Sequence, residues 1–248
     1  MEVHHHSHHP KKWKEYITEF LMLFLAVSLG FFAENIREQQ VEKHREISYL
    51  QNVHEDLKLD LINVDIVINS NTKELRAMDT LFQKINNNTI TNEDFYYYAR
   101  NILLRATFES SHIGLDQIKS AGGLRMIKNP IIISGIQDYE RGLDVLDKLE
   151  NTRERTIEQS RFKMAVIFEP TITYEMQVNQ GKGRMLFNRP KKADAIMQNN
   201  KQAVKELLNL ISFGINANLY LNNNLKKQIK IVQKLDSAIV KEYGDKFH

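Results

Sequence analysis

The sequence predicts an all-α protein in which one N-terminal transmembrane helix continues into an elongated antiparallel helical bundle or coiled coil. Three observations predict this fold. The 248 residues include four prolines and ten glycines, and no proline occurs between Pro10 and Pro130. A stretch near the N-terminus is apolar and uncharged over residues 20–33, and the apolar residues that follow recur at near-heptad spacing. Few helix-breaking residues and helical periodicity together indicate long helices.

Composition excludes several classes of function. Hydrophobic residues make up 42% and charged residues 26% of the chain, which is typical of a folded protein. The formal charge is +3 and the basic residues are scattered, so no nucleic-acid partner is expected. The absence of cysteine excludes disulfides and cysteine-bound metals, and it fits a bacterial periplasm. No cofactor is expected.

The apolar stretch divides the chain into three parts. Residues 1–14 form a histidine- and lysine-rich cytoplasmic tail, residues 15–34 a transmembrane helix, and residues 35–248 a periplasmic helical domain. Residues 20–33 carry no charge, and counting from residue 16 gives 18 residues, close to the roughly 20 that a bilayer core requires. Aromatic and basic side chains precede the span, and the positive-inside rule places the N-terminus in the cytoplasm of a bacterial inner membrane. These interface anchors are Trp13, Tyr16, Lys11, Lys12 and Lys14.

A cleaved signal peptide and a buried core helix are the alternatives. Ser28, Leu29 and Gly30 have the small-residue character of a cleavage site. Glu19 interrupts the apolar region, however, and the helical pattern continues beyond Gly30. A membrane anchor is therefore the favoured interpretation, with the lipid bilayer as its first partner.

One face of the span combines an acidic residue with small residues. Glu19, Ala26, Gly30 and Ala33 share this face, and small residues let two membrane helices approach closely. The pattern predicts self-association as a dimer or higher oligomer. Glu19 either faces a partner or an ion path, as intramembrane charges usually do, or reaches the cytoplasmic interface about one turn away.

Five histidines precede Pro10 and could bind a metal. Ser7 breaks the run, and a free tail lacks the fixed geometry of a metal site, so an adventitious or weakly regulatory role is favoured. The candidate ligands are His4, His5, His6, His8 and His9.

The first helix is expected to run on from the membrane to a polar turn at residues 86–89. Asn71 replaces an apolar residue in its near-heptad pattern, a substitution that often fixes the register of a coiled coil. The apolar positions are Leu50, Val53, Leu57, Leu61, Val64, Ile68, Leu75, Met78, Phe82 and Ile85.

Three further segments complete the predicted antiparallel bundle. Thr91 and Asp94 predict the capped start of a second helix, which continues to a glycine stop at residues 122–123. Pro130 opens a third helix over residues 130–165. A small β-hairpin or an ordered loop is expected near residues 171–190, followed by a last helix over residues 191–243.

No catalytic constellation is recognised, and the protein is predicted not to be an enzyme. Ser111 and His112 are neighbours in the chain but do not face one another on a helix. His54 with Asp56 and Asp60 has the spacing of a helical metal site, yet a second such motif is missing.

Two blocks of sequence resemble an uncharacterised family of single-span membrane proteins of Bacteroidota. The resemblance covers about half of the chain, and it implies a membrane location and a helical build without implying an activity. The first block comprises Tyr49, Leu50, Gln51, Asn52, Glu55, Asp56, Leu57 and Asp60, after the span with Glu19, and the second comprises residues 115–129.

The start of the span is also similar to that of flagellar stator rod subunits. Trp13 and Lys14 precede Glu19, as a tryptophan–lysine pair precedes an aspartate in those proteins. The resemblance implies that Glu19 carries protons against a polytopic membrane partner and that Trp13 anchors the interface. Glutamate replaces aspartate here, the match covers about ten residues, and no peptidoglycan-binding domain is recognised.

The leading functional hypothesis is a non-enzymatic, membrane-anchored scaffold that projects a rod into the periplasm and assembles with itself or with a protein partner. The alternative is the rod-like subunit of a proton-driven, stator-like motor. A ligand-sensing bundle is a third hypothesis, since bundles bind ligands between helices.

Overall fold

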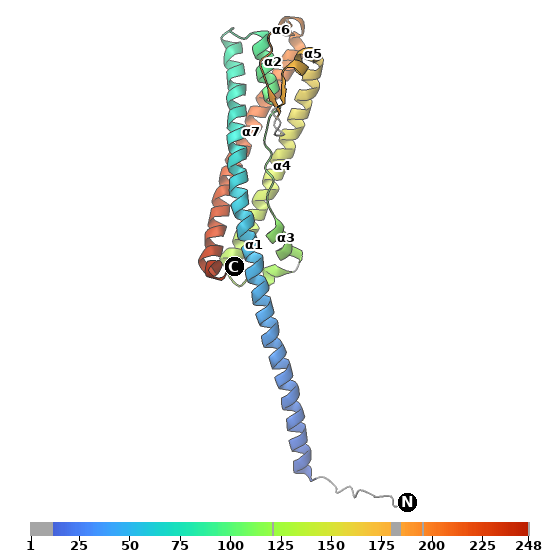
Figure 1. The fold of residues 1–248 in the computed structure, drawn as a ribbon, viewed down its shortest axis with the longest axis vertical. Helices are drawn as coiled ribbons and strands as arrows, with labels where there is room; N and C mark the ends of the chain where they lie inside the picture. The colour runs from blue at the N-terminus through green and yellow to red at the C-terminus, as the bar shows by residue number, and fades with distance from the viewer. Residues whose placement is uncertain (1–11, 121, 180–184, 195, 248) are drawn as a thin grey trace, which may run out of the picture.

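The computed structural model describes residues 12–120, 122–179, 185–194 and 196–247. The fold is all-α, with a long N-terminal helix that projects from one end of a helical bundle (Figure 1). The longer elements are α1 (Trp13–Asn86), α2 (Asn92–Asn101), α3 (Ile113–Ser120), α4 (Pro130–Ile167) and α7 (Lys201–Tyr243). The shorter ones are η1 (Gly123–Arg125), α5 (Pro170–Glu175), β1 (Gln177–Asn179), β2 (Met185–Phe187), α6 (Ile196–Asn199) and η2 (Gly244–Lys246).

Helix α1 is one uninterrupted helix of 74 residues. At 1.5 Å per residue it is about 110 Å long. Residues 13–45 of α1 project from the bundle, and Glu46 is its first buried residue. The helix ends at Asn86 with Asn87 as its C-cap, and Asn88 adopts a φ of 52° in the predicted polar turn. The expected continuity of the first helix is thus confirmed.

Three stacked hydrophobic clusters fix the direction of the long helices. The cluster at the base joins Leu50 of α1, Ile132 of α4 and Ile239 of α7. The cluster at the top joins Met78, Met164 and the N-terminal part of α7. Helices α1 and α4 therefore run parallel and α7 returns antiparallel, with a third cluster around Val64 between the other two.

The prediction of one continuous second helix is wrong. Helix α2 packs in the top cluster and α3 in the base cluster. The two levels, marked by Met78 and Val53 on α1, are 25 residues and so about 38 Å apart. Residues 102–112 span about 36 Å when extended but only about 17 Å as a helix. An extended connection is what lets this segment return to the base of the bundle.

The top of the bundle carries the small irregular elements. Strands β1 and β2 pair antiparallel with Val178 opposite Leu186, which is the hairpin expected as one of two alternatives. The tip of this hairpin, residues 180–184, lies outside the described residues. The last long helix begins at Lys201 rather than at 191, after the short helix α6.

Candidate functional site

The N-terminal part of α1 is long and apolar enough to cross a membrane. Among the described residues α1 is the one helix that meets this test, and its apolar window contributes nothing to the protein core. Met22, Leu23 and Phe24 are 60%, 68% and 57% exposed, and they lie on different sides of the helix because successive helical residues are rotated by about 100°. A helix that is apolar all round is normally buried in a core or a membrane. No described residue of the chain covers this apolar stretch.

The predicted interface anchors lie on the first turns of this helix. Trp13 and Tyr16 are exposed, and Lys12 and Lys14 flank Trp13. This places amphipathic rings and positive charges at one end of the apolar stretch, as at a membrane interface. Lys11 and the histidines of the tail lie outside the described residues.

Glu19 and the three small residues share one face of α1. At 100° per residue, Glu19, Ala26, Gly30 and Ala33 fall within a sector of about 60°. A Cβ atom added at Gly30 would meet nothing within 4 Å, so no described residue covers this face there. Glu19 and Ser28 are partly shielded, whereas the other residues from 13 to 33 are exposed. The intramembrane role of Glu19 stays a prediction.

A polar stalk separates the apolar stretch from the bundle. Residues 34–45 are almost entirely exposed, and Arg37 pairs with Glu34 at 2.5 Å. At the upper end of the stalk, the Tyr243 hydroxyl donates a hydrogen bond to Glu46 Oε1 at 2.6 Å. From Ala33 to Glu46 the helix rises about 20 Å. The C-terminal end of α7 therefore closes the bundle at a fixed height above the apolar stretch.

Two buried carboxylates of α1 hold the extended connection and α3 at the base. Asp56 accepts hydrogen bonds from Ser111 Oγ at 2.6 Å and from the Gly114 amide at 2.7 Å. Asp60 accepts from the Ser111 amide at 2.7 Å and from the Tyr139 hydroxyl. Burial raises the pKa of Asp60 to about 6 and also raises the pKa of Tyr139. These carboxylates, whose spacing is that of a helical metal site, thus accept hydrogen bonds from backbone amides and hydroxyls instead.

This junction brings together the two sequence blocks on which the family resemblance rests. Asn52 donates to Gln117 Oε1 at 2.6 Å across α1 and α3. Gly114 packs so closely that an added Cβ would lie 2.4 Å from the Val53 amide nitrogen. The helices could not approach in this way with a larger residue at position 114. The two blocks therefore form one packed structural unit at the base of the bundle.

A second polar network crosses the middle of the bundle. Arg153 is 1% exposed and donates to Glu74 Oε2 at 2.7 Å and to Asn71 Oδ1 at 2.8 Å. Asn71 in turn donates to Asn222 Oδ1 at 3.0 Å. Burial raises the pKa of Glu74, and the Arg153 charge opposes that rise. The network links α1, α4 and α7 through Asn71, the buried polar residue at a heptad position of α1, and its role in fixing the register stays a prediction.

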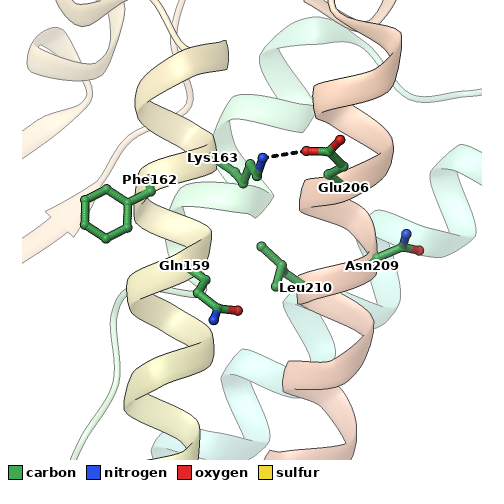
Figure 2. A pocket seen from close by; sticks show the side chains of 6 residues that line it. All are labelled: Gln159, Phe162, Lys163, Glu206, Asn209 and Leu210. Carbon is green, nitrogen blue, oxygen red and sulfur yellow. Dashed lines mark hydrogen bonds and ion pairs between the residues drawn. The ribbon is translucent and has the colours of Figure 1, made fainter.

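The surface between α4 and α7 contains a hollow that carries a single ion pair. Figure 2 shows Lys163 and Glu206 facing one another across it, with Nζ and Oε2 2.5 Å apart. Both side chains are about 40% exposed, so the pair contributes less than about 1 kcal/mol. Phe162 points away from α7. The six lining residues include no nucleophile beside a base, so the hollow has no catalytic arrangement.

The remaining candidates for chemistry are separated. Ser111 donates its hydroxyl to Asp56, while His112 Nδ1 lies 3.0 Å from the Ser110 carbonyl oxygen. His54 Nδ1 contacts Asp236 Oδ1 at 2.5 Å. In the described part of the chain, no group of three or more metal-ligating side chains is positioned to hold an ion. The described polar clusters instead connect neighbouring helices through hydrogen bonds.

Comparison with known proteins found no match, whether to protein-family models, to curated proteins or to solved structures.

Proposed function

We propose that the protein is a non-enzymatic, membrane-anchored scaffold that holds a rigid helical bundle at a set height above a bacterial inner membrane. The observation that carries this proposal is the continuity of α1 from Trp13 to Asn86. The same helix supplies the apolar stretch and one of the three long helices that share the core of the bundle. Any orientation imposed by the membrane is then transmitted directly to the bundle.

The proposed topology follows from the charges around the apolar stretch. Lys12 and Lys14 precede it, whereas Glu34 and Arg37 follow it with opposite signs and pair with each other. Lysines next to a span favour the cytoplasmic side, so the N-terminus is cytoplasmic and the bundle is periplasmic. The scaffold then self-associates or receives a protein partner in the periplasm.

Removal of residues 13–33 tests the anchor. The full chain is expected in the membrane fraction and to resist extraction by alkaline carbonate, and the shortened chain in the soluble fraction with its helical circular dichroism retained. The matched control removes residues 1–11, which leaves the apolar stretch intact and should leave the protein in the membrane. A full chain that alkaline carbonate releases from the membrane would contradict the proposal.

The placement of Glu19 supports a second candidate, a rod-like subunit of a proton-driven motor. Glu19 shares its face with Ala26 and Gly30, where a neighbouring membrane helix would pack closely. A carboxylate at a helix interface inside the membrane can carry protons. Glu19→Gln should then abolish proton-driven function while leaving assembly intact. Unchanged function in this variant would exclude the proton-carrier role.

A further inference from the structure

The outer face of α1 in the bundle carries an exposed apolar stripe. Leu59, Ile62 and Ile66 are 51%, 58% and 49% exposed. Their spacing of three and four residues places them side by side on one face of the helix. Val64, by contrast, belongs to the core, and it is rotated by about 200° from Ile62. This part of α1 is therefore apolar on the side opposite the core as well, which a solvated helix face normally is not.

The stripe lies on the same side of α1 as the small residues of the apolar stretch. Ile62 follows Ala26 by 36 residues, and Ile66 follows Gly30 by the same number. At 3.6 residues per turn, 36 residues are ten complete turns and a rise of about 54 Å. Because the match follows the natural period of a straight α-helix, two such helices can meet at both places without supercoiling.

We propose that a second copy of this chain covers the stripe, so that α1 pairs with α1 in parallel from the membrane into the bundle. The inference rests on the proposed membrane anchor. Two copies anchored by the same span stand in the same direction and present Ile62 at the same height. A two-fold axis along the membrane normal then brings each stripe onto its own counterpart, as a self-complementary interface requires.

The charges between the two apolar patches are compatible with this pairing. Arg37 and Glu55 lie on the same side of α1, where two like charges would meet across the axis. Each has a partner within its own chain: Arg37 pairs with Glu34 at 2.5 Å, and Glu55 with Lys58 at 3.5 Å. These pairs neutralise Arg37 and Glu55 locally, so repulsion between their like charges does not oppose the approach of a second copy.

The small size of the stripe fits a membrane-assisted contact. Three side chains provide far less than the roughly 1,000 Å² of buried surface that a stable interface in solution needs. Anchoring both copies in one bilayer raises their effective concentration, and contact along the span adds further area. The stripe sets the rotation of the bundles about the shared axis.

Single-cysteine cross-linking tests this pairing, because the chain has no cysteine of its own. The full chain is studied in membrane vesicles with Ile62→Cys, Ala26→Cys or Val145→Cys, and is oxidised with copper–phenanthroline. Val145 is a matched control because it is 42% exposed and lines a groove between α4 and α7. We expect disulfide-linked dimers from Ile62→Cys and Ala26→Cys, with Val145→Cys at background, since a disulfide needs Cα atoms within about 7 Å.

The outcomes separate this inference from the proposed function. If Ala26→Cys gives disulfide-linked dimers but Ile62→Cys gives no more than the Val145→Cys background, the stripe has no role in pairing. The anchored oligomer would still stand in that case. Background from all three variants in the membrane fraction would overturn α1 pairing altogether. A chain absent from the membrane fraction would overturn the anchor itself.

A charge substitution gives a second readout in mild detergent. Ile62→Glu is expected to weaken the dimer on the order of tenfold or more, because two unpaired carboxylates would face one another in the seam. Val145→Glu places the same charge on another exposed apolar position and should leave the measured mass unchanged. Since Ile62 is exposed, helical circular dichroism should be the same for both variants. Equal dimer masses for both variants would contradict the inference.

Discussion

The two halves of α1 belong to one helix but differ in what surrounds them. Residues 46–86 bury one face against α3, α4 and α7, and their buried polar side chains have partners in the same chain. Residues 13–45 bury no side chain, although they include the most apolar stretch of the protein. The core-facing side of the upper half is explained by packing within the monomer. The lower half has no such packing among the described residues, and under the proposed function the membrane and a second copy of α1 would cover it.

The largest expected effect comes from breaking the mid-bundle network. Arg153→Met removes the positive partner of Glu74 and leaves a buried carboxylate without its charge partner, a change that typically costs about 3 to 5 kcal/mol. We expect a correspondingly lower free energy of unfolding, measured by urea denaturation of the full chain in mild detergent. Membrane association should persist, because the apolar half of α1 is unchanged.

Arg161→Met is the matched control for this prediction. Arg161 pairs with Glu154 at 3.1 Å on the same helix, but both side chains are more than 40% exposed. Exposed pairs contribute at most about 1 kcal/mol. A loss of the same size in both variants would contradict the importance of the buried network.

The second-largest expected effect is that the free energy of unfolding depends on pH through Asp60, at the base of the bundle. The pKa of Asp60 is about 6 in the folded protein, above its ordinary value of 3.8, so the folded state binds this proton more tightly than the unfolded state. The proton on Asp60 therefore adds about 2 to 3 kcal/mol to the free energy of unfolding below about pH 4. This contribution is lost as the pH rises through 6. Unfolding measured from pH 4 to pH 7 checks the direction.

Asp60→Asn isolates the contribution of this residue, because an amide does not titrate. The variant should show a flatter dependence of unfolding free energy on pH than the unaltered protein. Identical slopes in the two proteins would assign the pH dependence to other groups.

A pair of glycine substitutions compares the two halves of α1 directly. Gly114→Ala would place a Cβ atom 2.4 Å from the Val53 amide nitrogen and force α3 away from α1. Overpacking of this kind costs about 1 to 3 kcal/mol. Gly30→Ala meets nothing within 4 Å in the monomer, so it should leave the unfolding transition of the bundle unchanged. Equal destabilisation by both substitutions would mean that the apolar half is packed within the monomer.

The smallest predicted effect concerns the start of α2. The Thr91 hydroxyl accepts a hydrogen bond from the Asp94 amide at 3.1 Å, as the sequence predicted. Thr91→Ala should lower the free energy of unfolding by about 1 kcal/mol through loss of this cap. Thr91→Ser keeps the hydroxyl and should restore most of the stability. A variant with serine that is as unstable as the alanine variant would point to lost packing instead.

The sequence predicted elements whose signals are local. Helical periodicity, the Thr91 cap and the proline at residue 130 located three of the long segments. The path of residues 102–112 could not be predicted, since its hydrogen bonds come from distant side chains. Ser70 Oγ accepts from the Ala106 amide, and Glu150 Oε1 accepts from the Phe108 amide. Such contacts exist only once the helices have assembled.

The buried polar networks between the helices could be only partly predicted from the sequence. Asn71 was recognised because a polar residue replaced an apolar one at a heptad position. Glu150 and Arg153 follow the same rule on α4, where they continue the spacing set by Leu146, and Asp60 does so on α1. That signal could have identified them as buried. Their partners could not have been identified, because pairing depends on the register between helices.

We propose that the apolar stretch, the stalk and the bundle form one rigid rod. Spin labels at Gln40→Cys and Lys58→Cys in the full chain test it most directly, with labelled protein diluted by unlabelled protein in lipid vesicles. The two sites are exposed, lie on the same side of α1 and are 18 residues apart, across the point where the stalk enters the bundle. Pulsed electron paramagnetic resonance should give one narrow distance distribution centred at about 27 Å. A broad or markedly shorter distribution would show that the stalk bends and would contradict the rigid anchor.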